Sequence, residues 1–313
     1  MSRGGKVGRS SRTRAINARY TTNICTKRPE RAARVRVIES DSTALLSRQS
    51  AHSFVREFDY TINPYGGCAL ACAYCYVPSI LHGRAEALGG WGNYVEVRVN
   101  APAVLRRQRH KLIGRSFFCA SATDPWQPVE RRYEITRRLL AILGEVPFRF
   151  GLFSTRSPLV CRDFDLLRIL ADRIEVGISV PTDREDIRRI FEPRNPPVRA
   201  RLGAAEALRN AGIPVRLHVS PALPASANFP RIAGDVADWV WLDWPAHFRA
   251  DWVALYRAHG LEEWLGRAKV EQEAARWRAV LGSERVRTGR PGFIGRGALT
   301  DDGGLSLLEQ PRA

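Results

Sequence analysis

The chain has 313 residues with 44% apolar content, which is long enough to bury a substantial core in one large domain or two small ones. It has no apolar run of about 18 residues, so neither a transmembrane helix nor a membrane partner is predicted. Six cysteines, three of them clustered, exclude the disulfide framework of a small secreted protein and indicate a reducing, cytoplasmic location. The formal net charge is +17.

The N-terminal segment carries much of this charge. Residues 1–36 hold eleven Lys or Arg against a single acid, Glu30. Such a basic arm can bind the phosphate backbone of a nucleic acid through counterion release. The alternative is a solvated tail, because polar Ser- and Arg-rich segments are usually disordered. We predict a disordered basic arm over residues 1–45, with nucleic acid as its candidate partner.

Short apolar segments rich in Val, Ile and Phe follow the arm and alternate with helical patterns. Strands buried on both faces have this composition, and the alternation favours parallel strands joined by right-handed crossovers. Six such units are fewer than the eight of a closed (β/α) barrel. We therefore predict an α/β fold, an open partial (β/α)6 barrel of the TIM type over residues 46–248, with strands at 59–64, 116–123, 148–155, 174–180, 213–220 and 238–244.

Several helix boundaries are marked in the sequence. Asp163 and Asp183 are predicted to cap the helices that follow the third and fourth strands. Gly212 is predicted to end the helix before the fifth strand. Residues 249–282 have the pattern of two further helices, so we predict a C-terminal helical extension with a Gly-rich tail over residues 249–313.

In parallel α/β folds, functional residues lie at the carboxyl ends of the strands. In this chain those ends carry short polar side chains and the cysteine cluster. We expect these residues to face one common cavity: Cys68, Cys72, Cys75, Ser121, Thr123, Asp124, Ser154, Ser179, Thr182 and His218. The alternative for His218 is a hydrogen-bonded histidine of the core. Arg156 could bind an anion, and the alternative is a surface residue.

The cluster CALACAYC, residues 68–75, has the spacing Cys-x3-Cys-x2-Cys. Thiolates are soft ligands, so zinc and an iron–sulfur cluster are the candidates. Structural zinc usually takes four protein ligands, for which only His82 lies nearby, whereas three cysteines on a [4Fe–4S] cluster leave one iron open. Three buried cysteines on one helix face would have the same spacing, but Pro64, Gly67 and Pro78 favour a loop.

CALACAYC resembles the Cys-x3-Cys-x-aromatic-Cys signature of radical S-adenosylmethionine (radical SAM) enzymes. Longer segments, NPYGGCALACAYCYV, SATDPWQPVE and STRSPLVCRDFDLL among them, resemble the branch related to spore photoproduct lyase, also called DNA repair photolyase-like, over residues 55–300. The resemblance implies a partial barrel of the radical SAM type and a lyase-like enzyme with a [4Fe–4S] cluster and SAM. It also implies an electron donor such as a flavodoxin or ferredoxin, and a nucleic acid as substrate.

The resemblance further implies which residues bind these cofactors. The cluster would be held by Cys68, Cys72 and Cys75, and the adenine of SAM would lie against Tyr74. The SAM amino group, carboxylate and ribose would be bound by residues at the strand ends, namely Ser121, Thr123, Asp124, Ser154 and Ser179.

Two departures from the branch concern the reaction. Gly66 stands where an arginine is common, so a charge near the cluster is expected to be missing. Tyr74 and Tyr76 match a catalytic tyrosine pair, but the cysteine that donates a hydrogen atom matches Ser121, whose O–H bond is too strong for this role. Cys119, two residues earlier and on the same strand face, is the candidate substitute; the alternative is a small core residue.

Two other functions remain as alternatives to a radical reaction on nucleic acid. One is a radical SAM reaction on a protein or a small molecule. The other is a zinc-stabilised nucleic-acid-binding protein without catalysis, which metal and sulfide analysis would distinguish.

Overall fold

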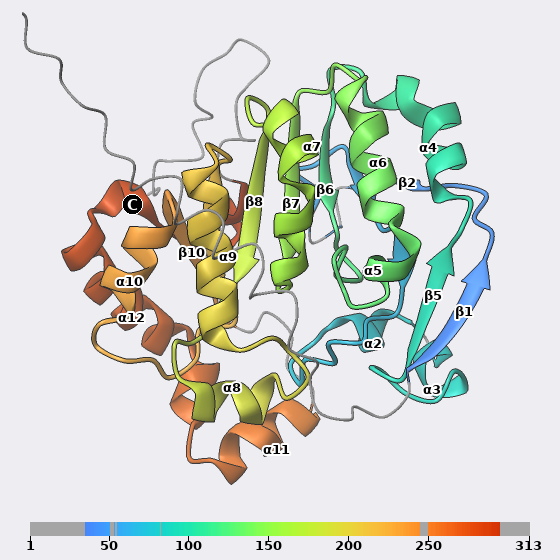
Figure 1. Cartoon of the computed structure of the whole chain (residues 1–313). Helices are drawn as coiled ribbons and strands as arrows, with labels where there is room; N and C mark the ends of the chain where they lie inside the picture. Colours follow the sequence, from blue (N-terminus) through green and yellow to red (C-terminus); the bar gives the residue numbers. More distant parts are fainter. Residues whose placement is uncertain (1–34, 51–52, 54, 82, 245–249, 295–313) are drawn as a thin grey trace, which may run out of the picture.

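The structure is a computed structural model, and it describes the whole chain except residues 1–34, 51–52, 54, 82, 245–249 and 295–313. The described part forms a main sheet of eight strands, a smaller sheet of three strands, and helices packed around the main sheet (Figure 1). No helix in these ranges is long and apolar enough to cross a membrane.

The main sheet contains all six predicted strands, side by side and in chain order. Their neighbouring pairs are parallel throughout. The sheet is open, because the first and last strands of its order do not pair with each other. The open partial barrel is therefore confirmed, with strands β3 (Tyr60–Ile62), β6 (Ser116–Cys119), β7 (Phe150–Thr155), β8 (Ile174–Ser179), β9 (Val215–Val219) and β10 (Trp239–Leu242).

Two further strands extend this sheet beyond the prediction. β2 (Leu46–Arg48) pairs antiparallel with β3 at one edge. β11 (Val286–Thr288) pairs parallel with β10 at the other edge. The predicted C-terminal extension therefore joins the main sheet, although its two helices, α11 (Ala250–Ala258) and α12 (Arg267–Leu281), are present as expected.

The smaller sheet has the order β1-β5-β4 and corrects the prediction for the N-terminal arm. β1 (Arg36–Ser40) lies within the segment predicted to be disordered, yet it pairs in parallel with β5 (Tyr94–Arg98). β4 (Tyr65–Gly66) pairs antiparallel with β5 and leads into the cysteine cluster. The rest of the arm, residues 1–34, and the end of the tail lie outside the described residues.

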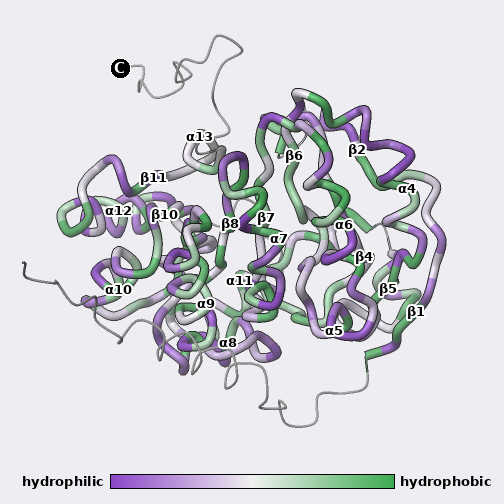
Figure 2. The backbone as a smooth tube through the Cα atoms, turned by 45° about the horizontal axis from the view of Figure 1, so that its top comes forward, coloured by the Kyte–Doolittle hydropathy of each residue, from purple (hydrophilic) through white to green (hydrophobic). Residues whose placement is uncertain are grey.

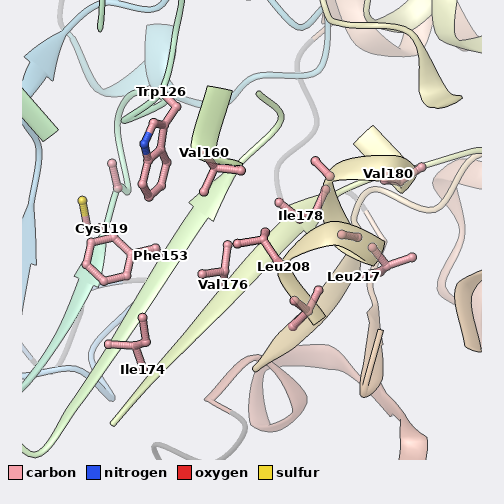
Figure 3. Packing of buried hydrophobic residues seen from close by; sticks show 14 of the residues in the cluster. Cys119, Trp126, Phe153, Val160, Ile174, Val176, Ile178, Val180, Leu208 and Leu217 are labelled. Carbon is pink, nitrogen blue, oxygen red and sulfur yellow. The ribbon is translucent and has the colours of Figure 1, made fainter. Parts of the chain in front are cut away.

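Alternating side chains of the strands form two separate apolar layers. Phe153, Val176 and Leu217 belong to the main core, which packs the sheet against the surrounding helices (Figure 3). Phe117 belongs to the same core. The opposite face contributes a smaller aromatic cluster that includes Phe118 and the side chains around it. Because apolar residues cover both faces, the strands carry the continuous hydrophobic runs of a buried parallel sheet.

The helices cover the sheet as amphipathic segments, and Figure 1 shows α6, α7 and α9 in front of the strands. Hydrophilic and hydrophobic residues alternate along α9, α10 and α12 in Figure 2, as expected for helices with one buried face. The helices not yet given are α2 (Val77–Ile80), α3 (Arg84–Ala87), α4 (Ala101–Gln108), α5 (Glu130–Tyr133), α6 (Ile135–Gly144), α7 (Phe164–Ile169), α8 (Glu185–Phe191), α9 (Val198–Asn210), α10 (Phe229–Val236) and α13 (Gly289–Ile294).

The predicted helix caps are partly wrong. Gly212 follows α9 with a φ of +78°, in the left-handed conformation expected at a helix end. Asp163 precedes α7, but its carboxylate accepts hydrogen bonds from Trp126 and Arg137 in place of the helix amides. Asp183 does not cap α8, because its carboxylate binds Ser226 instead. Long-range partners have displaced the local capping bonds in both cases.

Candidate active site

One cavity of about 200 Å³ lies at the carboxyl ends of the main-sheet strands. The expectation that polar strand-end residues face a common cavity is confirmed for all but one of them. Thr182 is the exception, because it is fully buried and its hydroxyl donates to the Pro224 carbonyl. The predicted site residues that line the cavity are Cys68, Cys72, Tyr74, Cys75, Tyr76, Ser121, Thr123, Asp124, Ser154 and Ser179.

The cysteine cluster forms a loop of consecutive turns, which excludes the alternative of a single helix face. Cys68 and Cys72 are buried and Cys75 is half-buried, and none of the three forms a disulfide. Gly67 enters this loop with a φ of +68°, and a Cβ there would lie 2.6 Å from the Tyr94 carbonyl oxygen. The loop can therefore pack against β5 only because glycine stands at this position.

The surrounding protein anchors the loop through hydrogen bonds to its backbone and to one sulfur. The amide of Ala69 donates to Gln127 Oε1 at 2.9 Å, and the amide of Ala73 donates to the Phe191 carbonyl at 2.9 Å. Asn195 Nδ2 lies 3.3 Å from Cys72 Sγ and donates to it. Hydrogen bonds to a sulfur stabilise its thiolate form, which is the form that binds metal.

The thiols fit an iron–sulfur cluster better than a single zinc ion. Burial raises the pKa of Cys68 and Cys72, so their thiolates need a cationic partner at this place. Structural zinc usually takes four protein ligands, whereas the loop offers three cysteines, which is the number that leaves one iron of a [4Fe–4S] cluster open. His82 lies outside the described residues.

A buried carboxylate, Glu192, connects several side chains of the site. It lies 2.7 Å from Arg201 and 3.1 Å from Arg156, and it accepts a hydrogen bond from the Tyr74 hydroxyl. Burial alone would raise the pKa of Glu192, but the two guanidinium groups outweigh it and the pKa is lowered. The ionised carboxylate thereby holds both Tyr74, inside the cysteine loop, and Arg156.

Arg156 corrects the expectation that a positive charge near the cluster is missing. It follows β7, lines the cavity, and lies over the Tyr74 ring at 5.8 Å from its centroid. Its charge favours the thiolate of Cys72, whose pKa it lowers against the effect of burial. Gly66 therefore does not leave the site without a cation, because a different strand supplies one. The strand-end position of Arg156 was the sequence signal for this role.

The residues at the end of β6 connect the cysteine loop to the sheet. Thr123 Oγ1 donates to the Gly67 carbonyl at 2.6 Å, and Ser121 Oγ accepts from Asn63 Nδ2 at 3.2 Å. Asp124 accepts from the Thr155 hydroxyl and the Arg156 amide, both at 2.7 Å. That these residues bind the SAM amino group stays a prediction. The structure adds that each of them forms hydrogen bonds to a neighbouring loop or strand end.

Ser154, Ser179 and His218 lie on the next three strands. Ser154 Oγ is 3.1 Å from His218 Nδ1, and both residues line the cavity. Burial lowers the pKa of His218 well below its usual value, so the ring is neutral. A Cβ on Gly177 would lie 2.5 Å from this ring, so the glycine makes room for it. Ser179 lines the cavity while its carbonyl accepts from Arg201.

The structure does not bring Cys119 to the cavity. Cys119 is 2% exposed and packs in the main core near Phe153 and Trp126 (Figure 3). The expectation that it shares a face with Ser121 is wrong, because β6 ends at Cys119 and strand alternation does not extend further. Its packing matches the alternative of a small core residue. Tyr76 does line the cavity, and its hydroxyl donates to the Ser121 carbonyl.

Three tryptophans and an aspartate from the C-terminal part of the chain also line the cavity, and the sequence reasoning did not assign them to the site. Trp241 and Trp244, on and after β10, and Trp252 of α11 line it together with Asp243. Asp243 is 5% exposed, and burial raises its pKa to about 7. The strand-end rule that identified the other residues would have found Asp243, had it been applied to the sixth predicted strand.

Comparisons with known proteins agree with this geometry. Residues 62–225, more than half of the 313-residue chain, match the family model of the radical SAM superfamily. The chain is 31% identical over 177 residues to the uncharacterized protein MJ0683 of Methanocaldococcus jannaschii, covering 56% of this chain and 65% of that protein. It is 30% identical over 189 residues to the uncharacterized protein Rv2578c of Mycobacterium tuberculosis strain H37Rv, covering 58% and 55%. It thus spans less than two thirds of either relative.

Solved structures with a similar fold include two of spore photoproduct lyase. One, complexed with the dinucleoside spore photoproduct, has a TM-score of 0.58 at 15% identity and covers 80% of this chain and 81% of that one. The other, of a cysteine-to-serine mutant of that enzyme, has a TM-score of 0.60 at 15% identity and covers 92% and 87%. At this identity the likeness shows a shared fold.

Proposed function

This chain belongs to the radical SAM superfamily, and from that membership we propose that it carries out a radical reaction on a nucleic acid. As a member it is an enzyme, and its cofactors are a [4Fe–4S] cluster and SAM, which removes the alternative of a non-catalytic zinc protein. When bound, the cluster supplies the electron that cleaves SAM and so starts the radical chemistry.

The residues proposed to hold these cofactors all line the cavity. Cys68, Cys72 and Cys75 would ligate the cluster, because their sulfurs line one cavity and Asn195 stabilises one of them. Arg156 adds a positive charge suited to the carboxylate of SAM. The remaining proposed contacts to SAM are the predicted ones, namely Tyr74, Ser121, Thr123, Asp124, Ser154 and Ser179.

The observation that carries the proposed substrate class is the group of tryptophans that lines the same cavity. Nucleobases stack on tryptophan side chains, and Trp241, Trp244 and Trp252 all face the cavity that contains the cysteines. The formal net charge of +17 supports an interaction with phosphate backbones. Spore photoproduct lyase, whose solved structure has a similar fold, was complexed with the dinucleoside spore photoproduct, a ligand of this class.

The proposed reaction is not repair through a cysteine hydrogen donor, because Cys119 lies in the core. Tyr76 stays a proposed catalytic residue, since its ring lines the cavity beside Cys75. Radical SAM enzymes need an electron donor, for which we propose a flavodoxin or a ferredoxin. A reducing compartment such as the cytoplasm suits both the cluster and the thiols.

The test uses anaerobically reconstituted, reduced full-length protein incubated with SAM, with and without UV-irradiated DNA. Mass spectrometry measures 5′-deoxyadenosine and, after digestion of the DNA, restored thymidine. We expect 5′-deoxyadenosine in both samples, and more of it with a nucleic acid substrate. Deoxyadenosine that responds only to added proteins or small molecules would favour the alternative substrate class. The control is Cys72→Ala, which should lose iron, acid-labile sulfide and deoxyadenosine together.

A further inference from the structure

Asp243 differs from Asp124, the other acidic residue in the described lining of the cavity, in how many hydrogen bonds its carboxylate accepts. It follows β10 and is nine-tenths buried, yet the one hydrogen bond to its carboxylate within the described residues is from the Trp244 amide to Oδ1, at 3.0 Å. Asp124, by contrast, accepts from Thr155, Arg156 and the backbone of Trp126. Asp243 therefore keeps hydrogen-bonding capacity for a ligand in the cavity.

The position of Asp243 separates it from the residues proposed to bind the cofactors. In the sheet order, β10 lies four strands from β6 and two strands from β8, which carries Ser179, the nearest proposed SAM contact. Asp243 and Trp252 also lie beyond residue 225, where the match to the radical SAM family ends. The cofactor chemistry is common to the superfamily, so residues outside the matched segment are the ones expected to select a substrate.

The surroundings of Asp243 are suited to a flat ligand. Trp241 precedes it by two residues on β10, and Trp244 follows it directly. Trp252, on α11, is 3% exposed and lines the same cavity. Aromatic walls with one polar group recognise a planar ring by stacking and by a hydrogen bond at the edge of the ring.

We propose that Asp243 binds the substrate, and that its carboxyl group pairs with the edge of a heterocycle that presents a carbonyl oxygen beside a ring N–H. Thymine, uracil and guanine have such an edge. A neutral carboxyl group donates its O–H to the carbonyl and accepts the N–H on its other oxygen. The inference deepens the proposed function and rests on it, since it names the nucleobase edge that the nucleic acid would offer.

The neutral form of Asp243 is accessible near neutral pH. Burial raises its pKa to about 7, and among the described residues a hydrogen bond from the Trp244 amide lowers it in part. Among the described residues no ion pair joins Asp243 to a charged group: Arg156 pairs with Glu192, and Asp124 accepts hydrogen bonds from Thr155 and Arg156. His218 is neutral. The pairing should therefore weaken as the pH rises above about 7 and the carboxyl group ionises.

The experiment compares two labelled probes by fluorescence anisotropy with the reconstituted enzyme. One is a short oligodeoxythymidylate, and the other is the same oligomer with N3-methylthymine, in which the ring N–H is blocked. Phosphate contacts contribute equally to both, so the ratio of the two dissociation constants reports the base edge. For the wild type we expect about a ten-fold preference for the unmodified oligomer below pH 7, declining above it.

Two substitutions of Asp243 separate pairing from structure. Asp243→Asn keeps a donor beside an acceptor and cannot ionise, so it should retain the preference at every pH. Asp243→Ala should lose the preference at every pH. Circular dichroism and iron content should match the wild type in both variants, because the side chain bonds only one described backbone amide.

Three outcomes would overturn the inference. An unchanged preference in Asp243→Ala would show that Asp243 does not read the base. If Asp243→Ala lost affinity for SAM by the same factor as it lost the preference for unmodified thymine, as measured by equilibrium dialysis, Asp243 would be assigned to the adenine of SAM. Absence of oligomer binding in the wild type, with 5′-deoxyadenosine still formed, would refute the nucleic acid function and this inference together. The first two outcomes leave the proposed function standing.

Discussion

At the scale of single residues, the site depends on buried charges that compensate one another. Glu192 joins Tyr74 of the cysteine loop to Arg156 of the cavity wall and to Arg201 of α9. A carboxylate between two guanidinium groups is stable in the interior because each desolvated charge has a partner. One residue thus holds together a loop, a strand end and a helix.

Glu192→Ala should destabilise the protein by about 3–5 kcal/mol, because it leaves Arg201 buried and Arg156 partly buried without their carboxylate. Urea denaturation of the protein without cofactors measures the effect. Glu192→Gln is the matched control and should cost less, since the amide oxygen still accepts hydrogen bonds. Equal urea midpoints for Glu192→Ala and the wild type would contradict the proposed compensation.

Cys119→Ala tests the placement of this side chain in the core. The substitution should leave iron content and 5′-deoxyadenosine formation unchanged, because Cys119 does not line the cavity. It should lower the free energy of unfolding by about 1 kcal/mol through the loss of buried contacts. A changed or missing nucleic acid product, with iron content and 5′-deoxyadenosine formation intact, would restore Cys119 as a hydrogen donor.

At the scale of elements, neighbouring strands shape the cavity through the sizes of facing side chains. The His218 ring of β9 lies over Gly177 of β8, and Ser154 of β7 bonds its Nδ1. The absence of a side chain on one strand therefore decides where the imidazole of the next strand lies.

Gly177→Ala should destabilise the protein by about 1–3 kcal/mol, since its Cβ would lie 2.5 Å from the His218 ring. Chemical denaturation of Gly177→Ala, His218→Ala and the double variant measures the coupling between the two positions. The double variant should be more stable than the sum of the single losses predicts, because removing the ring makes room for the methyl group. Strictly additive losses would contradict the contact.

At the scale of the whole molecule, the charge is distributed unevenly along the chain. Residues 1–34 hold ten Lys or Arg against one acid, whereas the formal net charge of the entire chain is +17. Within the cavity, by contrast, Arg156 pairs with the buried Glu192. The two regions should therefore contribute differently to nucleic acid binding, the arm through phosphates and the cavity through a base.

Replacing the ten basic residues of segment 1–34 with glutamine should weaken binding to all DNA sequences and flatten its salt dependence. For the single-stranded oligomer, each lost phosphate contact reduces the slope of log K against log salt by about 0.7. Titrations at several salt concentrations measure the slope, and the preference for unmodified thymine serves as the internal control. An unchanged slope would show that the arm does not contact phosphates.

The central strands, their parallel order and the cysteine loop could be predicted from the sequence, because hydrophobic periodicity and cysteine spacing are local patterns. The cysteine signature also indicated the superfamily. Which strand-end groups remain available to a ligand became visible only in the folded structure. Tyr74 and Glu192 are 118 positions apart, and Ser154 and His218 are 64 apart. Such partners meet only when the sheet is assembled. No local pattern could therefore show that Asp124 accepts several hydrogen bonds while Asp243 accepts one within the described residues. The same holds for the charge that Arg156 supplies and for the burial of Cys119.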